Sequence, residues 1–327
     1  MVHGDNAFRA LTCSSVALII ALASVAVAQP ARPWVVPRTP WGDPDLQGVY
    51  TNADEFNVPL EKPAEFEGRL LSDVSPEELA EFARTSNEQR ARNFERNNAF
   101  QGLTGVDLSN LRPSRRWLVA DPSAGRVPPL TADGERRRAE YEASLAQPAD
   151  EPASLNLWYR CIGLGVPGTM LPTQDGAPHR IFQAPGIIAI AHERLHETRV
   201  IPTDGRPHVA AEIRMYMGDA RGRWEGDSLV VETSNFKGQF RTTAAASEKL
   251  RIVERLTPVA PDALEWSVTF DDPSAWATPW TIAMRLTRTT EAMFEDACHE
   301  GNHTVRNILS GARADERAPA AAQGRGP

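Results

Sequence analysis

The stretch that decides the fold class is LEWSVTF, residues 264–270. Its apolar side chains occupy every second position, at Leu264, Trp266, Val268 and Phe270. Successive side chains of a β-strand point to opposite faces of the sheet, so a period of two is typical of a strand that buries one face. The stretch therefore predicts a half-buried strand.

The segments around this strand predict more strands with short connections. The residues Pro261-Asp262-Ala263 form a hairpin turn before it, and Gly222 and Gly226 mark further turns. Further strands are expected at residues 46–50, 181–191, 198–201, 214–217, 223–224, 228–233, 282–286 and 292–298. Short strands at this spacing predict a mainly β protein, folded as an antiparallel lipocalin-like β-barrel or as a sandwich.

The part of the chain before this predicted sheet differs in composition: it is rich in loop-forming residues and in signals for the start of a helix. Ser75, followed by Pro76 and two acids, predicts a helix that runs to about Arg96, and a second charged helix is expected from about Thr131 to about Leu145. The expected boundaries are a signal peptide at 1–28, a loop-rich and partly helical N-terminal region packed on the barrel at 29–157, the β-barrel at 158–312 and a disordered tail at 313–327.

The N-terminal residues are typical of a cleavable signal peptide. Arg9 precedes the apolar run SVALIIALASVAV (residues 15–27), and Ala26 and Ala28 form a small-x-small cleavage site. The run is shorter than the roughly 20 apolar residues that cross a bilayer, and no later segment comes close. We therefore expect cleavage near Ala28, a periplasmic or secreted protein, and no membrane span.

The composition limits the partners that this protein can have. Hydrophobic residues make up 41% of the chain and charged residues 24%, which is enough for a real core and excludes wholesale disorder. The formal net charge of −8 argues against nucleic acid and anionic membranes as partners. No phosphate-binding loop, dinucleotide fingerprint or nucleophile elbow occurs in a fitting context, so we expect no cofactor.

Removal of the signal peptide leaves two cysteines, Cys161 and Cys298. In an oxidising compartment an even pair predicts first of all a disulfide. Closing a loop of this length stabilises a fold by roughly 4–5 kcal/mol in the chain-entropy model. Two free thiols are the first alternative, and a metal or thiolate site is the second, since His299 adjoins Cys298.

Residues 192–196 (HERLH) match the H-E-x-x-H pattern of zinc proteases. In that motif His192 and His196 share one face of a helix and bind zinc, while Glu193 acts as the general base. The flanking sequences IIAIA and TRVIP favour strands instead of a helix. We therefore expect a crossing between two strands and no metal, with a metalloprotein as the third alternative for function.

Two polar clusters carry candidate chemistry. The first consists of Glu193, His196 and Arg199, where a histidine beside a carboxylate is a candidate general acid or base. The second follows Cys298 and consists of His299, Glu300, Asn302 and His303. A disulfide would draw Arg160 and the loop 163–168 towards the second cluster, and polar side chains that converge at a barrel mouth are typical of small-ligand sites.

Residues 219–227 (DARGRWEGD) concentrate charge, glycine and an aromatic side chain. Asp219, Arg221 and Trp224 are candidate ligand contacts. The alternative, which we favour, is structural, because Gly-Asp pairs form tight turns and Arg–Asp pairs hold them together. Trp276 and Trp280 are either the walls of a pocket or, more commonly for such residues, part of the core.

Several long segments together resemble a large family of exported, mostly uncharacterised proteins of Proteobacteria and Acidobacteria. The segments are TPWGDPDLQGVY (39–50), DPSAGRVPPLT (121–131), ERLHETRVIPTDGRPH (193–208), GDARGRWEGDSLVVETSNF (218–236), DDPSAWATPW (271–280), CHEGNH (298–303) and NILSGARA (307–314). The positions that recur in the family are Gln183, Glu193, His196, Arg199, Asp219, Arg221, Trp224, Glu225, Cys161, Cys298, His299, Glu300 and Asn302. The family pattern has Glu-x-x-His without a preceding histidine and an aromatic residue at 303, so the resemblance implies a site but names no reaction.

Taken together, these features predict a periplasmic enzyme that acts on a small, partly apolar organic molecule as a lyase, isomerase or hydrolase. The expected catalytic residues are His196, Glu193, His299 and Glu300. The expected ligand contacts are Gln183, Arg199, Asp219, Arg221, Trp224 and Asn302. The alternative is a non-catalytic periplasmic carrier with the same barrel, and the oligomeric state is left open.

Overall fold

The computed structural model describes residues 34–317, apart from 57, 70–72, 76, 79–80, 83, 87, 89–111, 147–148, 156, 173–176 and 238–242. The expected signal peptide lies outside the described residues. Most of the helix expected after Ser75 does so too, although Ser75 and Glu78 form its reciprocal cap, with hydrogen bonds of 3.1 and 3.0 Å.

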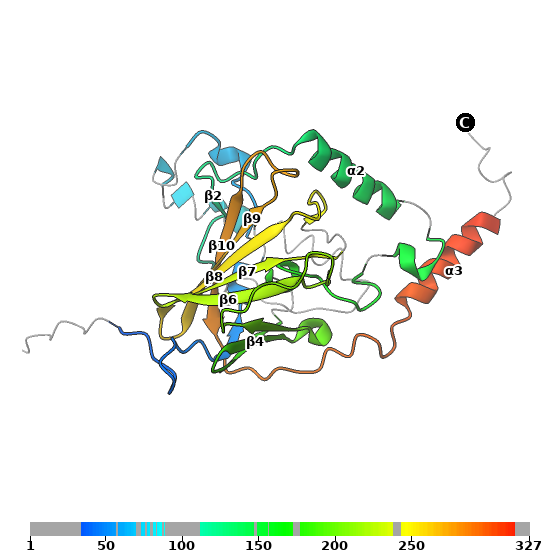
Figure 1. Cartoon of the computed structure of the whole chain (residues 1–327). Helices are drawn as coiled ribbons and strands as arrows, with labels where there is room; N and C mark the ends of the chain where they lie inside the picture. The colour runs from blue at the N-terminus through cyan, green and yellow to red at the C-terminus, as the bar shows by residue number, and fades with distance from the viewer. Residues whose placement is uncertain are drawn as a thin grey trace, which may run out of the picture. The chain divides into compact units, whose positions relative to one another are not determined.

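The core of the fold is one antiparallel sheet of ten strands (Figure 1). The strands are β1 Gly48–Thr51, β2 Val119–Asp121, β3 His179–Ala184, β4 Ile187–His192, β5 Thr198–Pro202, β6 Asp219–Glu225, β7 Ser228–Ser234, β8 Arg251–Ala260, β9 Ala263–Asp271 and β10 Trp280–Arg288. Nine of them follow the order β5-β4-β3-β1-β10-β9-β8-β7-β6, and β2 pairs with β10 off this path.

The sheet curls until its two outer strands, β5 and β6, meet. A Cβ atom at Gly222 of β6 would lie only 2.8 Å from Thr203 Cγ2 and 3.0 Å from Ile201 Cγ2, so glycine permits this close approach. No ladder joins β5 to β6 among the described residues, so the barrel is nearly closed. The prediction of a mainly β protein with an antiparallel barrel is confirmed.

The inward-facing side chains fill the barrel. In β9, Leu264, Trp266, Val268 and Phe270 are all buried, as their alternation predicts. The largest side chains from the barrel strands that are less than 2% exposed are Tyr50, Ile190, Ile201, Leu229, Ile252, Leu256, Trp266, Ile282, Met284 and Leu286. The axis of the barrel is therefore a packed core.

Three predicted strands differ from the structure. The apolar run 181–191 forms two strands, β3 and β4, because Gly186 takes a φ of 75° and turns the chain. Residues 214–217 contribute only an isolated bridge between Met215 and Phe236. Residues 292–298 form no strand, and the backbone N–H of Phe294 is instead donated to the Glu193 carboxylate.

Two longer helices with fully described bounds accompany the sheet, α2 (Ala132–Ala146) and α3 (Thr304–Arg317). The start of α2 is as predicted, because Thr131 Oγ1 accepts the Gly134 N–H at 3.1 Å. Helix α3 continues five residues into the stretch expected to be a disordered tail, and residues 318–327 lie outside the described part. No helix in the described part of the chain has the length and apolar character needed to cross a membrane.

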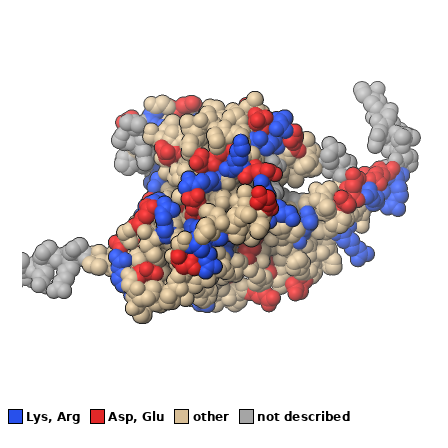
Figure 2. Space-filling model, viewed as in Figure 1, with Lys and Arg blue, Asp and Glu red and all other residues tan. Residues whose placement is uncertain are grey.

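Opposite charges alternate on the outer face of the strands β6 to β8. Glu225 pairs with Arg223 at 2.7 Å and with Arg255 at 2.8 Å, and Glu232 pairs with Arg251 at 2.6 Å. Figure 2 shows acidic and basic side chains side by side on the face in view. That face therefore presents a mixture of charges instead of a field of one sign.

Candidate functional site

The register of the strands places several candidate residues, among them Glu193, Arg199 and Asp219, at one end of the barrel. The starts of β3, β5, β6, β8 and β10 and the ends of β4, β7 and β9 lie at this end. We call it the crossing end, because residues 193–197 cross there from β4 to β5. They include the short 3₁₀ helix η7 (Arg194–His196).

The crossing separates the two histidines of the HERLH segment. His192 is the last residue of β4 and is buried, whereas His196 is exposed. Leu195 and His196 have φ angles of 59° and 53°, so no continuous α-helix runs through the segment. The expected strand-to-strand crossing is confirmed. Among the described residues, no three His, Cys, Asp or Glu side chains are grouped so that they could hold a metal.

The predicted disulfide is confirmed, and it brings two distant segments together. Cys161 and Cys298 are bonded, with their Cα atoms 5.8 Å apart and 137 residues between them along the chain. Asn302 Nδ2 donates a hydrogen bond of 3.0 Å to the Tyr159 carbonyl and lies 3.2 Å from Cys161 Sγ. The loop after residue 158 therefore meets the second polar cluster, as the sequence predicts.

The first polar cluster contacts the same C-terminal segment. Glu193 Oε2 accepts the Phe294 N–H at 2.7 Å, and the Leu195 N–H is donated to Asp296 Oδ2 at 2.8 Å. The structure thus holds residues 193–195 against residues 294–296, the segment that leads into residues 298–302. The side chains of His196, His299 and Glu300 are exposed, and their acid–base role stays a prediction.

A half-buried carboxylate in the crossing, that of Glu197, was not predicted from the sequence. Burial raises the pKa of Glu197, against the opposing hydrogen bond from Thr169 Oγ1, which lies 2.6 Å from Glu197 Oε2. A Cβ atom at Gly163, where φ is 144°, would overlap this carboxylate. Nothing in the local sequence indicates that residues 163 and 197 meet.

We expect Gly163→Ala to lower the free energy of unfolding by about 1–3 kcal/mol, because it pushes Glu197 away and strains the backbone. This loss of stability should be smaller in a Glu197→Ala background, where the carboxylate no longer occupies the space next to residue 163. Urea unfolding of the wild type, both single variants and the double variant measures this coupling. Additive losses would show that Gly163 and Glu197 do not interact.

Two predicted ligand contacts are engaged within the protein. Arg199 points into the barrel, where its guanidinium makes two hydrogen bonds, of 3.0 and 2.5 Å, to the carboxylate of Glu254. At the other end of the barrel, Gln183 accepts the Leu46 N–H at 2.6 Å and donates to the Pro44 carbonyl at 3.0 Å. The structure does not bring Gln183 to the crossing end.

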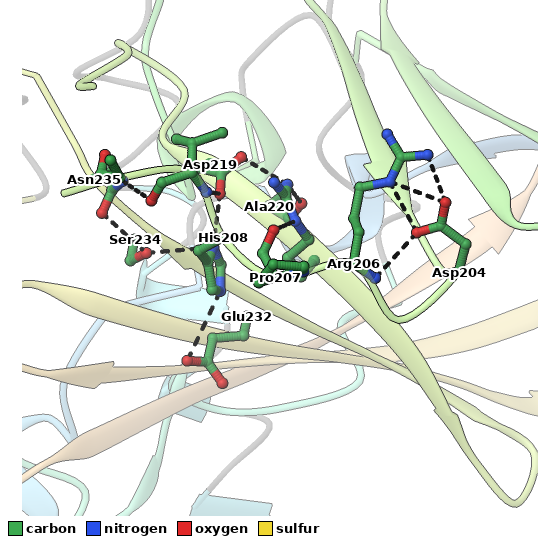
Figure 3. Close-up of polar contacts among 12 residues, drawn as sticks. Asp204, Arg206, Pro207, His208, Asp219, Ala220, Glu232, Ser234 and Asn235 are labelled. Atoms are coloured by element: carbon green, nitrogen blue, oxygen red, sulfur yellow. Dashed lines mark hydrogen bonds and ion pairs between the residues drawn. The ribbon is translucent and has the colours of Figure 1, made fainter. Parts of the chain in front are cut away.

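Asp219 and Arg221 belong to a separate network on the outer face of the barrel (Figure 3). Asp219 accepts the Arg221 guanidinium at 2.6 Å, the His208 imidazole at 2.8 Å and the Val209 N–H at 3.0 Å. Arg221 also donates to the Pro207 carbonyl at 2.8 Å. Trp224 lies on the inward side of β6, packed against the core.

The geometry of this network orients one imidazole. Because a carboxylate accepts hydrogen bonds, His208 donates its Nδ1–H to Asp219, and its Nε2 atom lies 4.0 Å from Glu232 Oε1. Ser234 Oγ lies 3.5 Å from the same Nδ1 atom that Asp219 binds, so the three residues do not form a nucleophilic triad. The network holds residues 207–210 against β6 and β7, in agreement with the favoured structural role of Asp219 and Arg221.

A pocket of about 400 Å³ opens at the crossing end, beside the start of β10. Trp276 and Trp280 form an aromatic wall, with ring centroids 5.6 Å apart, and Phe270 stacks on Trp280 at 4.2 Å. The other residues around it are Leu60, Glu61, Val127, Pro128, Pro129, Leu130, Glu135, Arg138, Ala244 and Ala245. The two tryptophans are thus both core residues and pocket walls, and no predicted catalytic residue lines this pocket.

Neither a protein-family model nor a curated protein matches the chain. Among solved structures, the chain is similar to a secretary abundant heat soluble (SAHS) protein from Ramazzottius varieornatus. The two are 11% identical, the alignment covers 37% of this chain and 80% of that chain, and the TM-score is 0.24. A likeness this distant carries no argument about function, so the barrel assignment rests on the strand order.

Proposed function

We propose that this protein is a non-catalytic carrier of a small, largely apolar organic molecule, and that it works outside the cytoplasm after export. The observation that carries the proposal is the tryptophan-walled pocket at the crossing end. Its volume of about 400 Å³ falls within the range of small-molecule sites. The barrel axis is filled by side chains, so the ligand would bind at the end of the barrel.

The chemistry of the pocket favours an apolar ligand with a polar end. Its walls are mainly aliphatic, proline and tryptophan side chains, and Glu61, one of its few polar groups, already accepts the Val127 N–H at 2.7 Å. Glu135 and Arg138 lie one turn apart on α2 and remain to orient a polar group of the ligand.

Two further observations support the proposed location outside the cytoplasm. The confirmed disulfide suits an oxidising compartment, and the N-terminal sequence is typical of an exported protein. The resemblance to a family of exported proteins agrees with both. The acid–base enzyme has less support, because His196 and His299 are exposed and neither lines the pocket.

Binding of the neutral apolar dye N-phenyl-1-naphthylamine tests the proposal, with energy transfer from tryptophan as the signal. We expect saturable binding that Leu60→Asp weakens at least about tenfold, because a charge in the wall must be desolvated. Val259→Asp is the matched control, since Leu60 is 45% exposed and Val259 43%, and Val259 lies outside the pocket. Equal binding by both variants, or none by the wild type, would remove the pocket as the binding site.

A further inference from the structure

Two buried histidines face each other inside the barrel at the crossing end. His179 is the first residue of β3 and His192 the last residue of β4, and the two are direct cross-strand partners. His179 is only 3% exposed and His192 only 2%. Their Nδ1 atoms lie 3.0 Å apart, so one imidazole donates its Nδ1–H to the other. Neither Nε2 atom has a hydrogen-bond partner within the described part of the chain.

This arrangement holds the pair in the neutral state. With one Nδ1–H shared, one ring has a protonated Nε2 and the other has an Nε2 lone pair. An additional proton must therefore enter at that second Nε2. It would create a buried cation with no acceptor for the new N–H among the described residues, which is costly in a barrel interior.

The charged groups around the pair make this cost larger. The positive charge of Arg199 in β5 is close enough to His192 to oppose protonation of its imidazole. The nearby carboxylate, Glu254 of β8, already binds both Nη atoms of Arg199 and accepts the Trp266 Nε1–H of β9 at 3.1 Å. From the crossing itself, Glu197 also interacts with Arg199, and it is held by Thr169.

The pair is coupled directly to the crossing. The His192 N–H is donated to the Glu197 carbonyl at 2.8 Å, and the Glu193 N–H to the Pro178 carbonyl at 3.0 Å. Through these two hydrogen bonds, movement of either histidine would shift residues 193–197. The hydrogen bonds of that segment to Phe294 and Asp296 depend on its position.

We propose that the His179–His192 pair is an acid-sensitive latch: proton uptake by the pair opens the crossing 193–197 and releases residues 294–296, while the strands β6 to β10 stay paired. The opening is local because the strands β3 to β5 have five or six residues each, whereas the ladders from β6 to β10 join strands of seven to ten residues.

The sign and the size of the effect follow from linkage. Burial lowers the pKa of His179 from 6.5 to about 4, and burial, then His179 and Arg199, lower that of His192. Below pH 6.5 the open state binds more protons, so the closed state loses stability as the pH falls towards 4. At pH 5 the shift at His179 alone favours opening roughly 30-fold. Glu197 acts in the opposite direction, because burial raises its pKa.

Hydrogen exchange followed by mass spectrometry tests the latch in the full chain at pH 7 and pH 5, after correction for the intrinsic rate. We expect peptides covering residues 187–199 to open at least about 30-fold more at pH 5 and peptides from β9 to be unchanged. In His179→Leu/His192→Leu the increase in opening at pH 5 should vanish, since an apolar pair takes up no proton. His208→Asn, which removes an imidazole on the outer face, should keep it.

A measurement on the wild type makes the test independent of how the double variant folds. In NMR titrations of the imidazole signals, His179 and His192 should stay neutral down to about pH 5 and then take up protons together with the loss of the crossing signals. Titration of both histidines near pH 6.5 with the crossing intact would overturn the proposal. So would acid opening that persists in the folded double variant.

Discussion

Glu254→Gln is expected to lower the free energy of unfolding by about 3–5 kcal/mol, although it changes only one carboxyl oxygen. The variant leaves the Arg199 guanidinium in the barrel interior without its counter-charge. Both side chains are almost completely buried, at 3% and 1% exposure, so water cannot replace the lost partner. The Trp266 Nε1–H also loses a charged acceptor.

Urea unfolding at pH 7 measures this loss, and two controls separate its causes. Glu225→Gln removes a carboxylate that binds Arg255 on the exposed outer face, and it should change the midpoint little. Arg199→Met/Glu254→Leu should recover most of the stability, because an apolar pair of similar volume needs no counter-charge. If Glu254→Gln unfolds at the same urea concentration as Glu225→Gln, the ion pair does not stabilise the barrel.

The second large effect is expected on removal of the disulfide. In the chain-entropy model, Cys161→Ser/Cys298→Ser loses about 5 kcal/mol, because the bond closes a loop of 137 residues in the unfolded chain. Guanidinium unfolding of this variant and of the oxidised and reduced wild type measures the loss. The reduced wild type should match the variant, since both lack only the covalent link.

The few contacts of the C-terminal segment indicate which result would contradict this prediction. Apart from the disulfide, the described residues after β10 hold to the rest mainly through the contacts of Phe294, Asp296, Asn302 and Arg313. A variant with an unchanged unfolding midpoint, but rapid proteolysis after residue 289, would mean that the bond only tethers this segment. The loop-closure argument would then be wrong for this protein.

The sequence predicted most clearly the strands with a long run of apolar side chains on the buried face. In β9 the inward positions are apolar, and in β10 they are apolar from Trp280 to Leu286, so the period of two is visible without the structure. The strand β8 escaped prediction because Glu254 occupies one of its inward positions and interrupts the apolar period. The partner that makes this tolerable, Arg199, lies 55 residues away in the chain, and no local pattern connects the two.

The candidate site was predictable only where covalent chemistry linked distant segments. Two cysteines and the expectation of an oxidising compartment were enough to predict which segments meet around Cys161 and Cys298. The contact of Gly163 with Glu197 and that of His208 with Asp219 depend on how the barrel closes, so local sequence patterns do not indicate them. The pocket at Trp276 and Trp280 also needs residues 127–130 and α2, which reach it from another part of the chain.

The place of β1 in the strand order has a consequence for how this chain acquires its structure. The disulfide encloses β3 to β10 in one covalent ring, whereas β1 stands outside the ring and pairs with both β3 and β10. Its partner Arg288 lies 238 residues after Tyr50. The first of the described strands to be synthesised must therefore wait for the last before the sheet is continuous, and pairing across so long a separation in sequence favours slow folding.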